Sequence, residues 1–178
     1  MTSGRLALRL TVGGLMMGHG LQKLNGSFGG PGLGGTEQSM GALGLHPAKY
    51  QAMAAALSET VGGGLTAAGF LSPLGPAMIT GTMAVAINKV HGKNGVWVTA
   101  GGFEYNLTLI AACLSLAASG PGLFSVDGLL GKQRSGFGWG VVALALGLGG
   151  AAATVAVASK LAPAGGPDTI PAGDESAS

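Results

Sequence analysis

Uncharged, mostly apolar stretches alternate with short charged or glycine- and proline-rich segments along the whole chain. The uncharged intervals are 13 residues long after Arg9, 29 after Glu59, 22 after Glu104 and 25 after Arg134. A helix that crosses a membrane needs about 20 mostly apolar residues. The pattern therefore predicts five transmembrane helices, at about 6–24, 50–71, 74–90, 101–119 and 138–159.

Glycine and proline mark the segments between these helices. Ser72–Pro76, with the sequence SPLGP, cannot easily continue one helix, so it predicts a tight turn within a helical hairpin. Residues 25–49 are predicted to form a flexible or re-entrant loop. The loop contains a formal G-x-G-x-x-G pattern at Gly30, Gly32 and Gly35, but it lacks the preceding strand of a dinucleotide-binding motif.

Composition supports a membrane protein. Charged residues make up 9% of the 178 residues, glycine occupies 36 positions, and the mean hydropathy is +0.49. These values exclude a disordered chain and leave too few charges to cover a soluble globule. A single cysteine excludes an internal disulfide. Basic residues form no stripe along any one element, which argues against nucleic-acid binding.

The predicted fold is an all-α membrane protein, built as an antiparallel four-helix transmembrane bundle plus a fifth C-terminal transmembrane helix. Residues 1–130 would form the bundle, 131–160 the additional helix, and 161–178 a disordered acidic tail. Small residues recur every four positions, at Gly14 and Gly18 and again at Ala143, Gly147 and Ala151. This spacing favours close helix packing inside the bundle, and the alternative for the fifth helix is a contact with another subunit.

Ionisable residues within apolar spans are costly and usually mark function or ion pairing. In an up-and-down bundle, six such residues converge at one membrane side: His19, Lys23, Glu59, Lys89, His91 and Glu104. Arg9 lies near the helical face of His19 and Lys23. Glu59, in mid-span, needs a partner such as His19, Lys23 or Lys89.

Structural roles are the alternative for each residue of this cluster. Lys23 and Lys89 could reach the headgroups, Glu104 could cap its helix, and the histidines could hydrogen-bond locally. As a site, a histidine and a carboxylate in an apolar pocket suit a quinone, whose carbonyls they can hydrogen-bond. Haem ligation by His19 and His91 is left open, although no haem-attachment motif is present.

Four segments resemble the DoxX family of bacterial membrane proteins: Arg5–Gly26, Ser58–Phe70, His91–Leu107 and Gly120–Asp127. The resemblance covers roughly residues 5–130 and implies a four-helix membrane bundle. The motif positions that it transfers to this chain are Arg9, His19, Lys23, Glu59, Gly63, Asn94, Glu104 and Asp127. The glycine-rich first loop and the fifth helix lie outside the family's common pattern and suggest a specialised partner.

The family is linked to thiosulfate:quinone oxidoreductases, terminal oxidase complexes and membrane complexes with soluble redox enzymes. The resemblance therefore implies a multi-pass subunit of a redox complex in the bacterial cytoplasmic (inner) membrane, in contact with lipid, a partner subunit and quinone. Whether the chain itself is part of an enzyme is left open. One alternative is a non-catalytic membrane anchor or scaffold for a partner oxidoreductase, and another is a small proton-coupled transporter.

Overall fold

Residues 2–162 are described by a computed structural model, and helices without any strand make up the regular structure of this part of the chain. The α-helices are α1 (Thr2–Asn25), α2 (Gly32–Ala42), α3 (Ala48–Ala68), α4 (Leu74–Ala86), α5 (Glu104–Ser119), α6 (Val126–Leu129) and α7 (Phe137–Lys160). Single turns of other helix types lie at 27–29, 87–91, 92–94 and 98–100. The all-α prediction is confirmed, and most of the predicted acidic tail falls outside the described residues.

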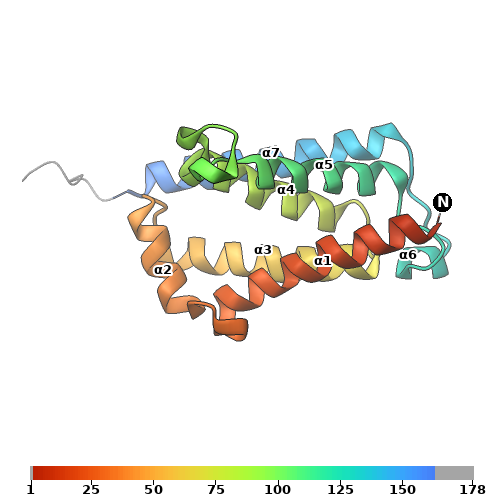
Figure 1. Cartoon of the computed structure of the whole chain (residues 1–178), viewed down its shortest axis with the longest axis horizontal. Coiled ribbons are helices and arrows are strands. Elements are labelled where there is room, and N and C mark those ends of the chain that lie inside the picture. The colour runs from red at the N-terminus through yellow and green to blue at the C-terminus, as the bar shows by residue number, and fades with distance from the viewer. Residues whose placement is uncertain (1, 163–178) are drawn as a thin grey trace, which may run out of the picture.

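Four helices form a closed ring. α1, α3, α4 and α5 run alternately in opposite directions, each packs on the next, and α5 packs back on α1 (Figure 1). α7 lies outside this ring against α4 and α5. α2 crosses one end of the bundle, here called the α2 end, and α6 lies beside the N-terminus at the other, the α6 end (Figure 1).

Helix length and composition do not establish five membrane crossings. Among the described helices, α7 is the one whose length and mean hydropathy are both sufficient to span a bilayer. α4 and α5 contain only 13 and 16 residues, and α1 carries Arg5, Arg9 and Lys23. The expected helices are present at the expected places, but the prediction that all five span a membrane is not confirmed.

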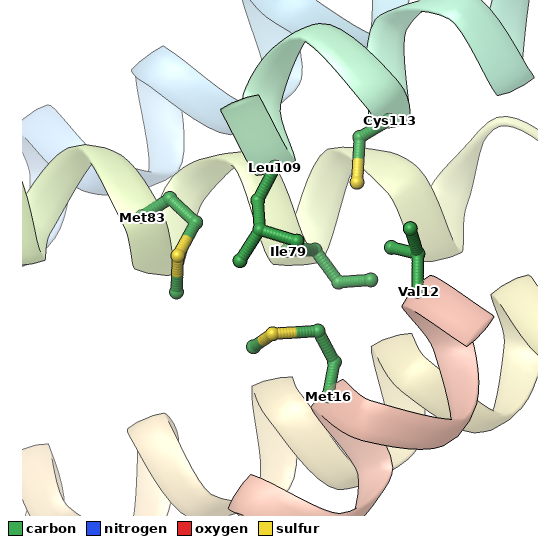
Figure 2. Packing of buried hydrophobic residues seen from close by; sticks show 6 residues of the cluster. All are labelled: Val12, Met16, Ile79, Met83, Leu109 and Cys113. Carbon is green, nitrogen blue, oxygen red and sulfur yellow. The ribbon is translucent and has the colours of Figure 1, made fainter. Parts of the chain in front are cut away.

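The apolar core of the ring lies between α1, α4 and α5. Each of these helices contributes two buried side chains spaced four residues apart, so that both point to the same side of the helix. The cluster consists of Val12, Met16, Ile79, Met83, Leu109 and Cys113 (Figure 2). This core holds α5 against α1 and α4.

Glycines bring α1 and α3 into backbone contact. A Cβ atom on Gly13 would lie 2.4 Å from the amide nitrogen of Ala67, and one on Gly20 would lie 2.3 Å from that of Thr60. Gly14 and Gly18 have open space around them, so the prediction that their four-residue spacing packs the bundle is wrong. The contact uses a spacing of seven residues, which also keeps side chains on one helical face.

The small residues of α7 do pack inside the molecule. Ala143, Gly147 and Ala151 are buried, and a Cβ atom on Gly147 would lie 2.8 Å from the side chain of Thr80 on α4. Internal packing, one of the two predicted roles of this spacing, is therefore the one observed within the described chain.

The predicted loop at 25–49 is wrong in its central part, because Gly32–Ala42 forms α2. Isolated helices of this length are marginal, and this one contains four glycines. Tertiary contacts with α1 and α3 hold it instead: Thr36 is buried, and its hydroxyl donates to the carbonyl oxygens of Gly32 at 2.7 Å and Lys23 at 3.3 Å. Local sequence signals do not report such contacts.

Candidate functional site

A cavity of about 610 Å³ occupies the half of the bundle nearer the α2 end. Its size falls within the range of about 300–1,000 Å³ that is typical of small-molecule sites. Methionine, leucine, alanine and glycine residues, most of them from α1, α2, α3, α4 and α7, make up most of its wall. The polar lining residues are His19, Lys23, Gln51, Ser58, Glu59, Thr82, Lys89, His91, Tyr105, Asn106 and Thr154. The cavity thus combines an apolar wall with a limited set of polar groups.

An ion pair between α1 and α3 is the main charged feature of this cavity. Lys23 Nζ lies 2.5 Å from Glu59 Oε2, and the two side chains are 27% and 4% exposed. Of the three partners expected for Glu59, Lys23 is the one that the structure provides. The bond uses one carboxylate oxygen, and Oε1 has no hydrogen-bond partner among the described residues. Glu59 therefore keeps an acceptor available beside the cavity.

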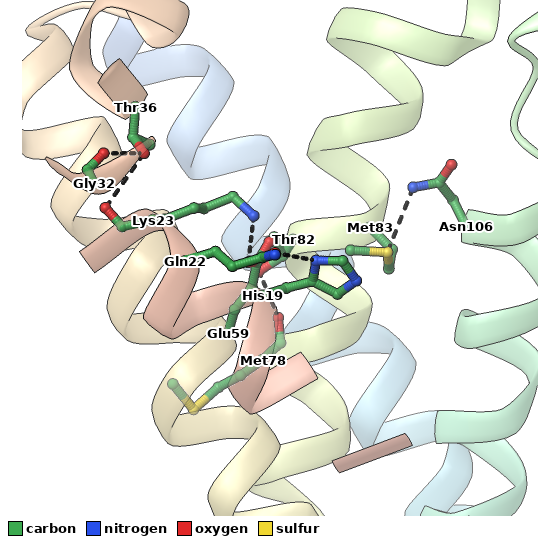
Figure 3. A network of polar contacts seen from close by, with 10 residues as sticks. All are labelled: His19, Gln22, Lys23, Gly32, Thr36, Glu59, Met78, Thr82, Met83 and Asn106. Carbon is green, nitrogen blue, oxygen red and sulfur yellow. Dashed lines mark hydrogen bonds and ion pairs between the residues drawn. The ribbon is translucent and has the colours of Figure 1, made fainter. Parts of the chain in front are cut away.

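Two further polar contacts lie close to this pair in the sequence of α1. His19 lies one helical turn before Lys23, and its Nδ1 atom contacts Gln22 Oε1 at 3.0 Å (Figure 3). The Thr36 hydroxyl binds the main chain of Lys23, which ties α2 to the end of α1 that carries the site. The glycine-rich segment that sequence reasoning treated as a loop is thus part of the structure that surrounds the cavity.

Sequence reasoning missed the polar residues on the α4–α5 side. Asn106 is buried, and its amide donates to the sulfur of Met83 at 3.4 Å (Figure 3). Both residues line the cavity. A signal was present in the sequence: Asn106 lies three and seven residues before Leu109 and Cys113, on the face of α5 that enters the core. A polar residue at such a position indicates a buried polar contact.

The segment that follows α4 brings His91 to the cavity and fixes it there. His91 Nδ1 donates to the carbonyl oxygen of Gly101 at 2.9 Å, because a backbone carbonyl can only accept. This leaves Nε2 as an acceptor in the neutral ring. Asn94 Nδ2 donates to the same oxygen at 3.2 Å. The two side chains close the loop between α4 and α5 over the cavity end of the bundle.

We expect Asn94→Ala to loosen this loop without unfolding the bundle. The variant removes one exposed hydrogen bond, which contributes about 0.5–1.5 kcal/mol. Amide hydrogen exchange in residues 95–103 should accelerate about three- to tenfold, as measured by mass spectrometry. Asn88→Ala is the matched control, because Asn88 is exposed nearby and its side chain makes no hydrogen bond to residues 2–162. Equal acceleration in both variants would contradict the conclusion that the Asn94 hydrogen bond holds this loop.

Two of the predicted site residues lie away from the cavity. Glu104 is the first residue of α5 and does not line the cavity, in keeping with its alternative role at a helix start. Arg9 lies towards the α6 end, where its guanidinium donates to the carbonyl oxygens of Ala67, Pro121 and Phe124. Arg9 therefore does not set the charge of the cavity, although it shares α1 with His19 and Lys23.

Asp127 makes a second set of buried hydrogen bonds at the α6 end. Its carboxylate is fully buried and accepts from the backbone amides of Leu71 at 3.2 Å and Ser72 at 2.8 Å. Its own amide donates to Gly69 at 3.0 Å. These bonds hold the α3–α4 turn against the segment after α5. Arg9 and Asp127 thus each bind backbone groups of segments that are far apart in the sequence, and both stabilise the α6 end of the bundle.

The comparison with models of known protein families identifies the family of this chain. The family model described as DoxX matches residues 4–92. The chain belongs to the DoxX family. No curated protein and no solved structure matches it. The family is one of membrane proteins, often associated with redox systems. The family membership inferred from the sequence is confirmed, but the match ends at residue 92, so the resemblance expected for residues 93–130 stays a prediction.

The DoxX match covers only part of the cavity. It includes α1, α2, α3 and α4, and with them His19, Lys23, Glu59 and His91. α5 and α7 lie beyond the matched range, yet Asn106 and the Leu146–Thr154 part of α7 complete the cavity wall. The charged part of the site therefore belongs to the family region, and its opposite wall comes from outside it.

Proposed function

We propose that this DoxX-family chain is a multi-pass subunit of a bacterial redox complex in the cytoplasmic membrane, and that its cavity holds the head of a membrane quinone. The observation that carries the proposal is the Lys23–Glu59 pair beside an otherwise largely apolar cavity. An ion pair in such a place costs desolvation energy, and a hydrophobic pair of similar volume would often stabilise the fold equally well. Its presence is better explained by a polar ligand.

The outer surface of the bundle supports a membrane location. Large apolar side chains are exposed on α1, α3, α5 and α7, whereas glycine and alanine occupy the close contacts of α1 with α3 and of α7 with α4. The exposed residues include Leu8, Leu10, Leu15, Leu57, Val61, Leu107, Val141, Leu146 and Leu148. Soluble monomers rarely expose large apolar patches, so this number of exposed large apolar side chains favours a surface that faces lipid. Small residues at helix contacts and large ones outside are typical of helices that pack in lipid.

The residues of the cavity would each perform a defined task. Lys23 Nζ donates hydrogen bonds, while Glu59 Oε1 and an imidazole nitrogen of His19 can accept or hold a proton. The methionine side chains exclude water, which strengthens these polar contacts. When bound, a quinone would supply the chemistry of electron acceptance coupled to proton uptake. The chain supplies binding, orientation and proton-holding groups, and its redox partner supplies the electrons.

We expect Glu59→Gln to weaken quinone binding at least tenfold. The substitution keeps the shape of the side chain but removes its charge and its capacity to hold a proton. A hydrogen bond to a charged group contributes about 1.5–3 kcal/mol, and 1.4 kcal/mol corresponds to a factor of ten. The measurement is quinone retained per chain in lipid nanodiscs during a titration, after subtraction of the value for empty nanodiscs.

Glu104→Gln is the matched control, because it is the same substitution outside the cavity wall. It should leave quinone retention unchanged. A wild-type chain that retains no quinone, or an equal loss in both variants, would contradict the proposal. The chain would then be better explained as an anchor, whose deletion detaches a partner oxidoreductase from the membrane while the partner keeps its activity.

A further inference from the structure

A second space adjoins the cavity between α3 and α7. It measures about 470 Å³ and lies between the first turns of α3 and the last turns of α7. Its lining residues are Pro47, Tyr50, Gln51, Ala54, Ala153, Thr154, Val157 and Leu161. Gln51, Ala54 and Thr154 also line the larger cavity, so the two spaces meet. Together they extend from the Lys23–Glu59 pair to the outer surface of the bundle.

The two ends of this passage differ in chemistry. The inner end carries the charged and hydrogen-bonding groups of Lys23, Glu59 and His19. No charged side chain lines the outer space, and most of its wall is alanine, valine, leucine, proline and the tyrosine ring. Such a passage matches a molecule with a polar head and an extended hydrocarbon tail, and a compact polar solute would leave its outer half empty.

Small residues on α7 keep the passage open. Gly150, Ala151 and Ala153 line one space or the other, and each leaves room that a larger side chain would fill. α3 and α7 both pack on α4, which forms the floor between them. The passage therefore opens between α3 and α7, and its outer part lies beside the terminal turns of both helices at the α2 end.

We propose that the ligand is a long-chain amphiphile that enters sideways from the bilayer between α3 and α7. Its head lies at the Lys23–Glu59 pair, and its tail lies in the space bounded by Ala54, Ala153 and Val157. The inference rests on the proposed quinone function and deepens it by assigning the tail a site of its own. It also gives α7, which lies outside the family match, a direct part in ligand binding.

Ala153→Leu tests this assignment. Ala153 is exposed and lines only the outer space, so the variant narrows the tail site without touching the polar cavity. Ala152→Leu is the matched control, because Ala152 is the adjacent residue, is also exposed and lines neither space. The probes are a benzoquinone and a naphthoquinone, each with and without a polyisoprenoid tail. Retention in nanodiscs is compared between variants for one probe at a time, so that partitioning into lipid cancels.

We expect Ala153→Leu to weaken retention of the tailed probes about tenfold and to change that of the tail-less probes less than twofold. Val157→Phe, also confined to the outer space, should act in the same direction. Unchanged retention of every probe in both variants, or an equal loss of tailed and tail-less probes, would overturn the lateral passage and leave the quinone site standing. If the wild-type chain retains none of the probes, the proposed function fails and this inference fails with it.

Discussion

Gly13→Ala is expected to destabilise the bundle by about 2–3 kcal/mol, although alanine is the better helix former. The new Cβ atom would lie 2.4 Å from the amide nitrogen of Ala67 and 2.6 Å from the carbonyl oxygen of Gly63. Both atoms belong to the backbone of α3, so no side-chain rotation can relieve the overlap. Overpacking of this kind costs about 1–3 kcal/mol and occasionally more. The apparent melting temperature in lipid nanodiscs should fall by about 5–10 °C.

The neighbouring glycine provides the control. A Cβ atom on Gly14 would meet nothing within 4 Å, so Gly14→Ala should be neutral, or stabilising by up to about 1 kcal/mol through helix propensity. The two variants make the same chemical change at consecutive residues of one helix. A larger loss for Gly14→Ala than for Gly13→Ala would mean that the other face of α1 forms the essential contact.

This pair of glycines also shows what the sequence could not provide. Small-residue spacing predicts that a helix packs closely, but it does not say which of several glycines faces the partner. α1 has glycines at 4, 13, 14, 18 and 20, and the four-residue pattern at 14 and 18 selected the wrong face. The position of α3 decides the contact, and that position depends on turns far along the chain.

The polar cluster was more predictable because it follows from topology. Once the helices alternate in direction, residues near the end of α1, at the middle of α3 and just after α4 are brought towards the same half of the bundle. His19, Lys23, Glu59, Lys89 and His91 indeed line one cavity. The exact partner of Glu59 and the contribution of Asn106 depend on helix rotation, which hydrophobic spacing fixes only approximately.

The error for residues 25–49 has a different cause. Its glycine content indicates a loop because glycine is unfavourable in helices. α2 forms nevertheless, since it packs on α1 and α3 and since Thr36 connects it to the main chain of Lys23. Helices in proteins depend on such packing more than on propensity. Met40 of α2 lines the cavity, so this error also concealed part of the site.

Arg9→Lys is expected to cost about 3 kcal/mol of stability while leaving the cavity intact. The guanidinium donates to the carbonyl oxygens of Ala67 at 2.9 Å, of Phe124 at 2.6 Å and of Pro121. Arg9 is 6% exposed, so water cannot easily replace the lost donors. A lysine keeps the charge but cannot reach three acceptors in different directions. Each buried group left without a partner costs about 1–3 kcal/mol.

Arg5→Lys serves as the control for Arg9→Lys, because Arg5 makes a single recorded hydrogen bond, to the carbonyl oxygen of Ser119, at an exposed position. Its loss should lower the melting temperature by no more than about 2 °C. The decisive comparison combines stability with ligand retention at a temperature where the Arg9→Lys chain is folded. Reduced stability with unchanged quinone retention would mean that Arg9 stabilises the α6 end of the bundle and does not contribute to the ligand site. A folded Arg9→Lys chain that loses quinone as Glu59→Gln does would instead return Arg9 to the site, despite its position outside the cavity wall.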